Sequence, residues 1–224
     1  GTESGAYIYN LRTGKYTHLR SSEYDPYSLS DNAIYSFCKD REDGIWIGSY
    51  FGGVNYYPRS YTHFEKYYPK GEENSLHGKR VREFCRDNYG VLWIGTEDGG
   101  LNRFNLNTKE FSFFAPSAGF TNIHGLCLVD DKLWVGTFSK GLKIIDTRTG
   151  TVLKTYQKNS SPRSLIDNSI FAICRTATGD IYLGTMFGLV KYNKQSDDFD
   201  RIPELNGKFV YDIKEDSGGN IWLA

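Results

Sequence analysis

The sequence of 224 residues has no run of 18 or more apolar residues, and it has only one methionine. A membrane-spanning helix needs about 20 consecutive apolar residues, so we expect no membrane contact in this segment. Lys plus Arg and Asp plus Glu each number 27, and no basic stripe is present. The electrostatic footprint of a nucleic-acid-binding protein is therefore missing, and we expect no nucleic-acid partner.

Sequence motifs for metal binding and catalysis are also missing. There is no CxxC or HxxxH spacing, no Gly-x-Ser-x-Gly elbow and no phosphate-binding loop. Several aspartates lie in short polar turns without the alternating carboxylate ladder of a calcium loop. We expect them to shape turns instead: Asp40, Asp43, Asp87, Asp130, Asp131 and Asp216. No metal and no cofactor is predicted.

What the sequence has instead is a repeated phrase built around an aromatic residue. Residues 44–49 (GIWIGS) return as 91–96 (VLWIGT), 132–137 (KLWVGT), 180–185 (DIYLGT) and, shortened, 220–224 (NIWLA). The first two residues, Gly1-Thr2, match the end of another copy. A period of about 40–50 residues is typical of repeat architectures, among them propellers. We expect the chain to be a piece of a longer repeat protein.

Each period divides into four short apolar or aromatic runs separated by turns. In one repeat the runs are residues 34–38, 45–48, 54–57 and 63–67. No helical periodicity competes, and aromatic residues, which favour strands, make up 16% of the chain. We therefore predict an all-β fold, a β-propeller of four-stranded antiparallel blades with about five blade-equivalents, part of a larger propeller with seven or eight blades. The blades are expected at residues 32–68, 80–114, 122–156 and 168–202, with residues 1–20 and 209–224 as a split blade or incomplete ends.

Two residue types at fixed repeat positions have structural interpretations. The aromatic residue of the phrase is predicted to lie in the core between blades (Trp46, Trp93, Trp134, Tyr182 and Trp222). The four cysteines share one place on the first run of their repeats: Cys38, Cys85, Cys127 and Cys174. A disulfide framework would not place every cysteine at an equivalent position, so we interpret them as small buried hydrophobic residues.

Variable loops on a constant scaffold are where binding sites usually lie. In a propeller, the turns after the second strand and the links into the first strand share one face. On that face we predict a mixed aromatic and charged binding surface, suited to a polar, ring-shaped ligand such as a sugar: Tyr50, Phe51, Arg80, Glu97, Asp98, His124, Phe138, Lys140 and Phe187. The alternative is that these aromatic side chains only pack on neighbouring loops.

An enzymatic site would need more acidic residues than the first runs supply. A glycosidase uses two carboxylates facing a common pocket, and among those runs only Glu83 is acidic before the turn. We therefore predict no catalytic residue in this segment.

The links between repeats carry a second motif. Residues 25–34 (DPYSLSDNAI) match residues 161–170 (SPRSLIDNSI), and residues 73–81 are a looser copy. Together with the turn, the Trp phrase and the strand Gly99–Asn102 that follow, this motif resembles the two-component regulator propeller repeat. The resemblance covers essentially the whole chain. The fourth repeat departs from it with Tyr182, and the third lacks the Ser-Leu link.

The resemblance implies a location and a role. This repeat fills the periplasmic sensor region of hybrid two-component systems of gut Bacteroidetes, which are anchored in the inner membrane and sense oligosaccharides. The chain is then expected to bind an oligosaccharide, while remaining blades, a C-terminal β-sandwich and a histidine kinase lie elsewhere in a homodimeric parent. Two other functions stay open: an interaction or dimerisation scaffold without a small ligand, and a five-bladed glycan-active enzyme.

Overall fold

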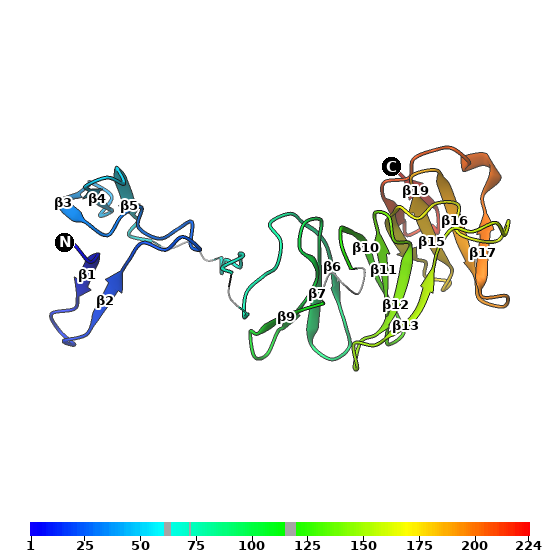
Figure 1. Ribbon diagram of the computed structural model, residues 1–224, viewed down its shortest axis with the longest axis horizontal. Coiled ribbons are helices and arrows are strands. Elements are labelled where there is room, and N and C mark those ends of the chain that lie inside the picture. The colour runs from blue at the N-terminus through cyan, green and yellow to red at the C-terminus, as the bar shows by residue number, and fades with distance from the viewer. Residues whose placement is uncertain (61–63, 72, 115–119) are drawn as a thin grey trace. The chain divides into compact units, whose positions relative to one another are not determined.

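The computed structural model describes residues 1–60, 64–71, 73–114 and 120–224, and the chain divides into two compact units, Gly1–Lys70 and Gly71–Ala224 (Figure 1). The predicted all-β fold is confirmed, because the described residues form antiparallel sheets and a single short 3₁₀ helix, η2 (Pro203–Leu205). Among the described residues, no helix is long and apolar enough to span a bilayer.

The first unit contains two small sheets. Strands β1 (Ala6–Tyr9) and β2 (Tyr16–Leu19) form a hairpin, and β3 (Ile34–Lys39), β4 (Ile45–Ser49) and β5 (Val54–Tyr57) form a three-stranded sheet. A fourth strand expected over residues 63–67 is not formed at 64–67, and residue 63 lies outside the described residues. The buried core of this unit is small and consists of Ala6, Leu29, Ile34 and Ile47.

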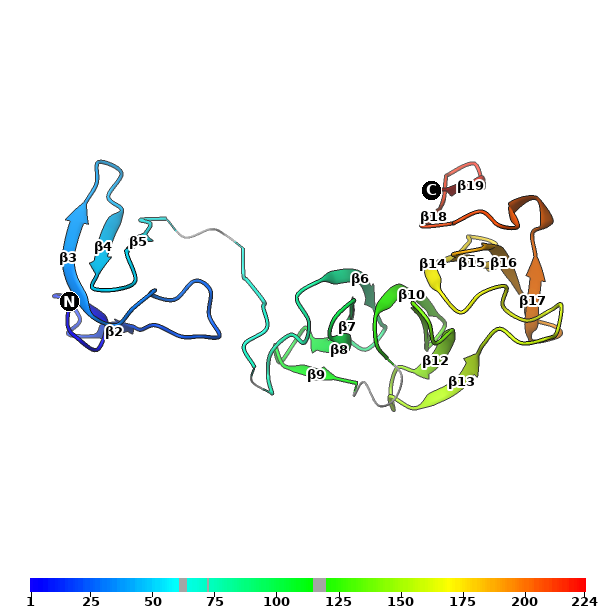
Figure 2. The ribbon, with the colours of Figure 1, turned by 45° about the horizontal axis from the view of Figure 1, so that its top comes forward.

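The second unit holds three four-stranded sheets and a final pair of strands (Figure 2). The first two sheets are β6–β9 (Val81–Arg86, Val91–Thr96, Gly100–Asn105, Phe111–Phe113) and β10–β13 (Ile123–Val129, Lys132–Thr137, Leu142–Asp146, Val152–Tyr156). The third is β14–β17 (Ile170–Arg175, Ile181–Thr185, Gly188–Asn193, Asp198–Arg201), and β18 (Ile213–Glu215) pairs with β19 (Ile221–Leu223). In each sheet the strands follow chain order, which is the meander of a propeller blade.

Consecutive sheets of the second unit pack face to face through the glycine of the repeated phrase. A Cβ atom on Gly95 would lie 2.6 Å from Ile123 Cγ2, at the start of the next sheet. The same close approach joins Gly136 to Ile170 and Gly184 to Val210. The phrase therefore needs glycine because the next blade's first aliphatic side chain sits directly on it.

The repeated tryptophan has a partner that the sequence did not reveal. In three repeats its indole Nε1 donates to the aspartate that opens the preceding hairpin, namely Trp46 to Asp40, Trp93 to Asp87 and Trp222 to Asp216. The other carboxylate oxygen of each aspartate accepts backbone N–H groups two and four residues later. These three aspartates thus shape their turns, as expected.

The prediction that the repeated aromatic residues lie in the core is correct for two of the tryptophans. Trp93 and Trp134 are buried between sheets, whereas Trp46 is 45% and Trp222 is 67% exposed. The difference follows from packing. Trp46 and Trp222 each lie on a sheet that no further sheet among the described residues of the same unit covers on the tryptophan side. All four cysteines are free, but the interpretation of them as buried residues is wrong for Cys38, which pairs with the exposed Trp46 and is itself exposed. Cys85, Cys127 and Cys174 are partly buried, and burial raises the pKa of the Cys85 thiol to about 11.

Candidate functional site

The first strand of four sheets contains a β-bulge at one and the same place. In β3 the pairing register with β4 changes between Ile34 and Ser36, which leaves Tyr35 outside the ladder. The same change leaves out one residue of β6, β10 and β14. A bulge re-aims the side chain of the extra residue, and such bulges are common beside functional sites. We call these the extruded residues: Tyr35, Arg82, His124 and Phe171.

Tyr211 holds the corresponding position before β18, and we count it among the extruded residues. It follows Val210, which packs on Gly184 as Ile123 packs on Gly95 and Ile170 on Gly136. Each extruded residue of the second unit is therefore preceded by a β-branched residue. The residues before His124 and Phe171 pack against the motif glycine of the preceding sheet, so the backbone from which these two side chains extend is held in place.

The extruded residues of the second unit meet. The guanidinium carbon of Arg82 lies 4.4 Å from the centroid of the Tyr211 ring, although two four-stranded sheets lie between them in sequence. The His124 and Phe171 rings are in edge contact at 4.7 Å, and the Phe171 and Tyr211 centroids are 5.8 Å apart. The first strands thus bring a cation, an imidazole and two aromatic rings to one place.

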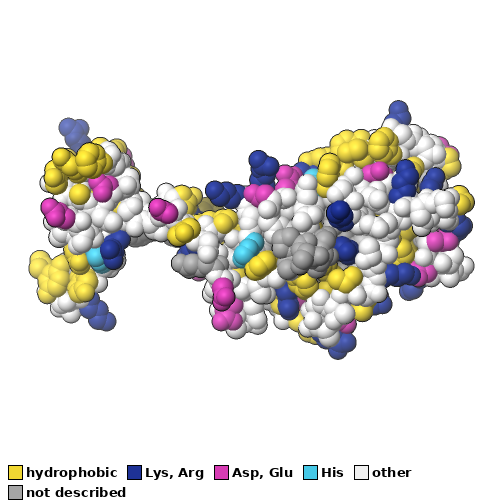
Figure 3. All heavy atoms as spheres, viewed as in Figure 1, with side chains coloured by type: hydrophobic (Ala, Val, Ile, Leu, Met, Phe, Trp, Pro, Cys, Tyr) yellow, Lys and Arg dark blue, Asp and Glu magenta, His cyan; other side chains and the backbone are white. Residues whose placement is uncertain are grey.

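Loop residues complete this group. The Phe138 ring lies 5.8 Å from His124, and the Phe209 ring lies 4.6 Å from Phe171. Glu97 accepts an N–H of Arg82 at 3.2 Å. Figure 3 shows hydrophobic side chains gathered on the surface of the second unit near the C-terminus, and Phe209 and Tyr211 are 50% and 45% exposed. We call the whole group the inner-strand cluster: Arg82, Glu97, His124, Phe138, Phe171, Phe209 and Tyr211.

His124 is the most unusual member of the inner-strand cluster. Its side chain is only 6% exposed, and its Nε2 donates to Asn122 Oδ1 at 2.7 Å. Because an amide oxygen can only accept, Nε2 carries the proton and Nδ1 the lone pair. Nδ1 is buried and has no hydrogen-bond partner among the described residues. Burial, helped by the charge of Arg82, lowers the pKa of His124, so the imidazole is neutral at pH 7.

The backbone next to His124 is also held in a special conformation. Asn122 has φ 53°, in the left-handed region that asparagine tolerates better than most residues. Its carbonyl oxygen accepts the backbone N–H of Phe138 at 3.0 Å. Asn122 thereby fixes His124 through its side chain and Phe138 through its backbone.

The structure brings three of the nine predicted site residues into the inner-strand cluster: Glu97, His124 and Phe138. Asp98 instead accepts the backbone N–H groups of Lys79 and Arg80, which lowers the pKa of its carboxyl, the bond from Arg80 contributing most. Its carboxylate thus orders the link that contains Arg80. The prediction that Asp98 binds a ligand remains a prediction, but its oxygens already have partners.

Lys140 and Phe187 lie in turns, and within the described part of the chain neither makes a ring or ion-pair contact with the inner-strand cluster. The backbone N–H of Lys140 bonds to Thr137 Oγ1, and that of Phe187 bonds to Thr185 Oγ1. The Phe187 ring is 50% exposed. These two residues stay candidates by position in the loops, not by contact.

In the first unit, Tyr50 and Phe51 join the extruded Tyr35. The Tyr50 ring lies 5.0 Å from Tyr35 and 4.3 Å from Phe51. Asp31 Oδ2 accepts the backbone N–H of Phe51 at 3.0 Å, so the link holds the turn in place. The three rings form an exposed aromatic surface on their own unit.

Five members of these surfaces were missed as site residues: Tyr35, Arg82, Phe171, Phe209 and Tyr211. One signal could have found all of them except Phe209. Each of the other four follows an isoleucine or valine that begins the first run of its repeat, and the residue at this position varies between repeats while its neighbour stays aliphatic.

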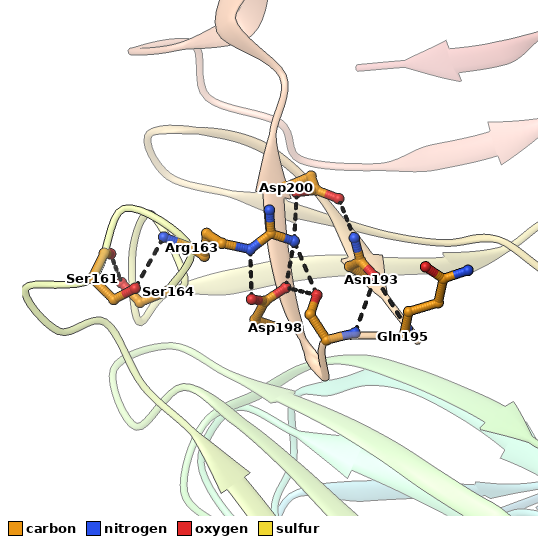
Figure 4. A network of polar contacts seen from close by, with 8 residues as sticks. Ser161, Arg163, Ser164, Asn193, Gln195, Asp198 and Asp200 are labelled. Carbon is orange, nitrogen blue, oxygen red and sulfur yellow. Dashed lines mark hydrogen bonds and ion pairs between the residues drawn. The ribbon is translucent and has the colours of Figure 1, made fainter.

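A hollow of about 1030 Å³ lies elsewhere in the second unit. It lies between sheets β10–β13 and β14–β17, and none of the predicted site residues lines it. Next to it, Figure 4 shows Arg163 binding Asp198 through two N–H groups at 2.5 and 2.8 Å and reaching Asp200 at 3.0 Å. This ion-pair network attaches the link before β14 to strand β17.

Comparison with known families tests the resemblance. Residues 28–51, 75–98 and 164–187 match the family model described as two component regulator propeller. These three segments are similar to the two component regulator propeller repeat. Each spans the Ser-Leu link, the extruded residue and the Trp or Tyr phrase. No curated protein sequence matches the chain.

Solved structures share the fold of these propeller repeats. The extracellular domain of a putative hybrid two component system from B. thetaiotaomicron is 24% identical with a TM-score of 0.56, covering 100% of this chain and 29% of that one. A second such domain from that organism is 18% identical with a TM-score of 0.55, covering 99% and 38%. Virginiamycin B lyase from Staphylococcus aureus, in an inactive form with quinupristin, is 13% identical with a TM-score of 0.50, covering 97% and 69%. The chain thus spans well under half of the two sensor domains, and the likeness shows the fold.

Proposed function

We propose that this chain is an extracytoplasmic, periplasmic ligand-sensing part of a hybrid two-component sensor kinase, and that it recognises an oligosaccharide at the inner-strand cluster. Its three segments similar to the two component regulator propeller repeat, and the extracellular two-component domains that share its fold, support the sensor role. Signalling then passes through further blades and a membrane-anchored, homodimeric kinase that are encoded outside these residues. The chain itself binds and does not catalyse.

The observation that carries this proposal is the buried His124 Nδ1 without a partner, packed among aromatic rings. An unpaired buried acceptor costs free energy, and a ligand hydroxyl that pairs with it recovers that cost. Glu97 offers a second acceptor, and Arg82 has N–H groups beyond the one bonded to Glu97. Donors and acceptors beside apolar ring faces match a sugar, which has hydroxyl groups at its edge and C–H groups on its face.

The experiment is calorimetric titration of the 224-residue chain with neutral oligosaccharides from glucan, mannan, xylan and fructan and with anionic ones from polygalacturonate and heparan sulfate. We expect saturable binding of at least one, weakened about ten-fold or more by His124→Gln. The matched control is Tyr89→Leu, an exposed tyrosine in the hairpin between β6 and β7, at the other end of the first strand. Saturable binding that is unaffected by His124→Gln in a folded variant, or no binding of any probe, would contradict the proposal.

A further inference from the structure

The extruded positions combine two properties that rarely occur together. Their neighbours on the N-terminal side are constrained, because Ile123 and Ile170 leave no room for a Cβ on the glycines that they touch. The extruded residues themselves take no part in strand pairing, so the ladder places no demand on their size or charge. A position outside the strand ladder beside a fixed one can change chemistry without changing the strand pairing.

The residues found there vary in chemistry between repeats: a phenol in Tyr35 and Tyr211, a guanidinium in Arg82, an imidazole in His124 and a phenyl ring in Phe171. In contrast, the residue after each extruded residue pairs with the motif glycine, and this glycine is present in all four sheets. Diversity at this one position is therefore not matched by diversity in the blade frame.

In the second unit the extruded side chains also converge, since the Arg82 guanidinium lies over the Tyr211 ring and the His124 ring is in edge contact with Phe171. Side chains from four successive repeats thus form one continuous group, in which Tyr211 is 45% exposed and His124 and Phe171 are each 6% exposed.

We propose that the extruded residue is the specificity-determining position of the repeat, so that ligand preference is set by one side chain per blade. This inference rests on the proposed function, and it assigns Tyr35, Arg82, Phe171 and Tyr211 to ligand recognition. Arg82 supplies directed N–H donors, and the aromatic members supply stacking faces. The turn residues Lys140 and Phe187 are left outside this set.

The test compares the ratio of Kd values for two oligosaccharides that the wild-type chain binds in the panel above. We expect Tyr211→Leu and Arg82→Gln each to change that ratio by about three-fold to ten-fold, because a stacked ring or a directed hydrogen bond is lost for one ligand more than for the other. Tyr89→Leu, in the hairpin between β6 and β7 of the same unit, is the control, and we expect it to leave the ratio within about two-fold. Phe187→Leu reports separately on the turns.

The outcomes separate the inference from the proposed function. If the wild-type chain binds no probe, the proposed function fails and the inference fails with it. If it binds but folded Tyr211→Leu and Arg82→Gln keep the wild-type ratio, only the inference is overturned. A larger change in Phe187→Leu than in both extruded-position variants also overturns it, because preference would then lie in the turns. Tyr211 is 45% exposed, so its substitution does not depend on repacking a core.

Discussion

Trp93 Nε1 donates a hydrogen bond of 2.9 Å to Asp87 Oδ2, and both residues are buried between sheets β6–β9 and β10–β13. The same carboxylate accepts the backbone N–H groups of Tyr89 and Val91 through Oδ1. One aspartate therefore closes a hairpin and fixes the orientation of the core tryptophan. This pair ties the local turn of the repeat to the packing between its blades.

Removal of this carboxylate is expected to destabilise the second unit strongly. Asp87→Ala leaves three N–H donors without an acceptor, and we expect a loss of about 2 to 4 kcal/mol in the free energy of unfolding. Asp216→Ala breaks the same contacts to an exposed tryptophan, where water replaces them, so it should cost much less. Denaturant unfolding followed by tryptophan fluorescence measures both, and equal losses would contradict the role given to burial.

The close approach of Gly136 and Ile170 gives a second prediction. A Cβ on Gly136 would lie 2.7 Å from Ile170 Cγ2, so Gly136→Ala should lower the free energy of unfolding by about 1–3 kcal/mol. The double variant with Ile170→Ala should lose less than the sum of the two single variants, since the clashing methyl is gone. Gly218→Ala is the control, because its Cβ would meet only side-chain ends at 3.2 and 3.3 Å. Strict additivity would show that the clash does not exist.

His124 predicts a dependence of stability on pH. Burial lowers the pKa of its imidazole in the folded chain, whereas the unfolded chain titrates near the ordinary value of 6.5. The unfolded state therefore binds the proton first, and stability that is present above about pH 6.5 falls as the pH is lowered from there. Unfolding midpoints measured between about pH 8 and pH 5 should decline less in His124→Gln. An identical decline in that variant would assign the effect to another group.

Asp197 joins two blades from a strained turn position. Its carboxylate accepts the hydroxyl of Tyr192 at 2.8 Å and contacts Lys154 and Tyr156 of the preceding sheet. Its φ is 57°, whereas the equivalent place in the preceding sheet is Gly150. Both Asp197→Ala and Asp197→Gly lose the carboxylate contacts, but only alanine keeps the cost of a positive φ. Asp197→Ala should therefore be less stable than Asp197→Gly by about 1 kcal/mol. Thermal unfolding of the two variants decides this, and equal stability would contradict it.

The sequence predicted the blade frame because its determinants are local. Strand runs, turns and the Trp phrase recur in order, so the four-stranded sheets follow from one repeat read several times. The fourth strand near residue 64 was expected from Phe64 and Tyr67 but is not formed, because alternating aromatic residues do not by themselves provide a paired edge. The indole–aspartate bond was missed because it depends on the geometry of the hairpin.

The candidate site was predicted only in part for a related reason. His124, Phe138 and Glu97 were found because aromatic and charged residues in turns are conspicuous. Arg82 and Phe171 were interpreted as ordinary strand residues. A shift of one residue in the pairing register places them outside the ladder, and the composition of a single strand does not predict such a shift. Their convergence depends on the packing of four sheets.

The measurement that tests the central claim most directly is the imidazole ¹⁵N spectrum of His124 during titration with an oligosaccharide that the chain binds. His124→Gln assigns the resonance, and His77 and His18, which lie outside the cluster, serve as internal references. We predict that the His124 Nδ1 resonance shifts in proportion to the fraction of chain bound, while the two references do not move. A saturated complex in which the His124 Nδ1 resonance is unchanged would contradict the account.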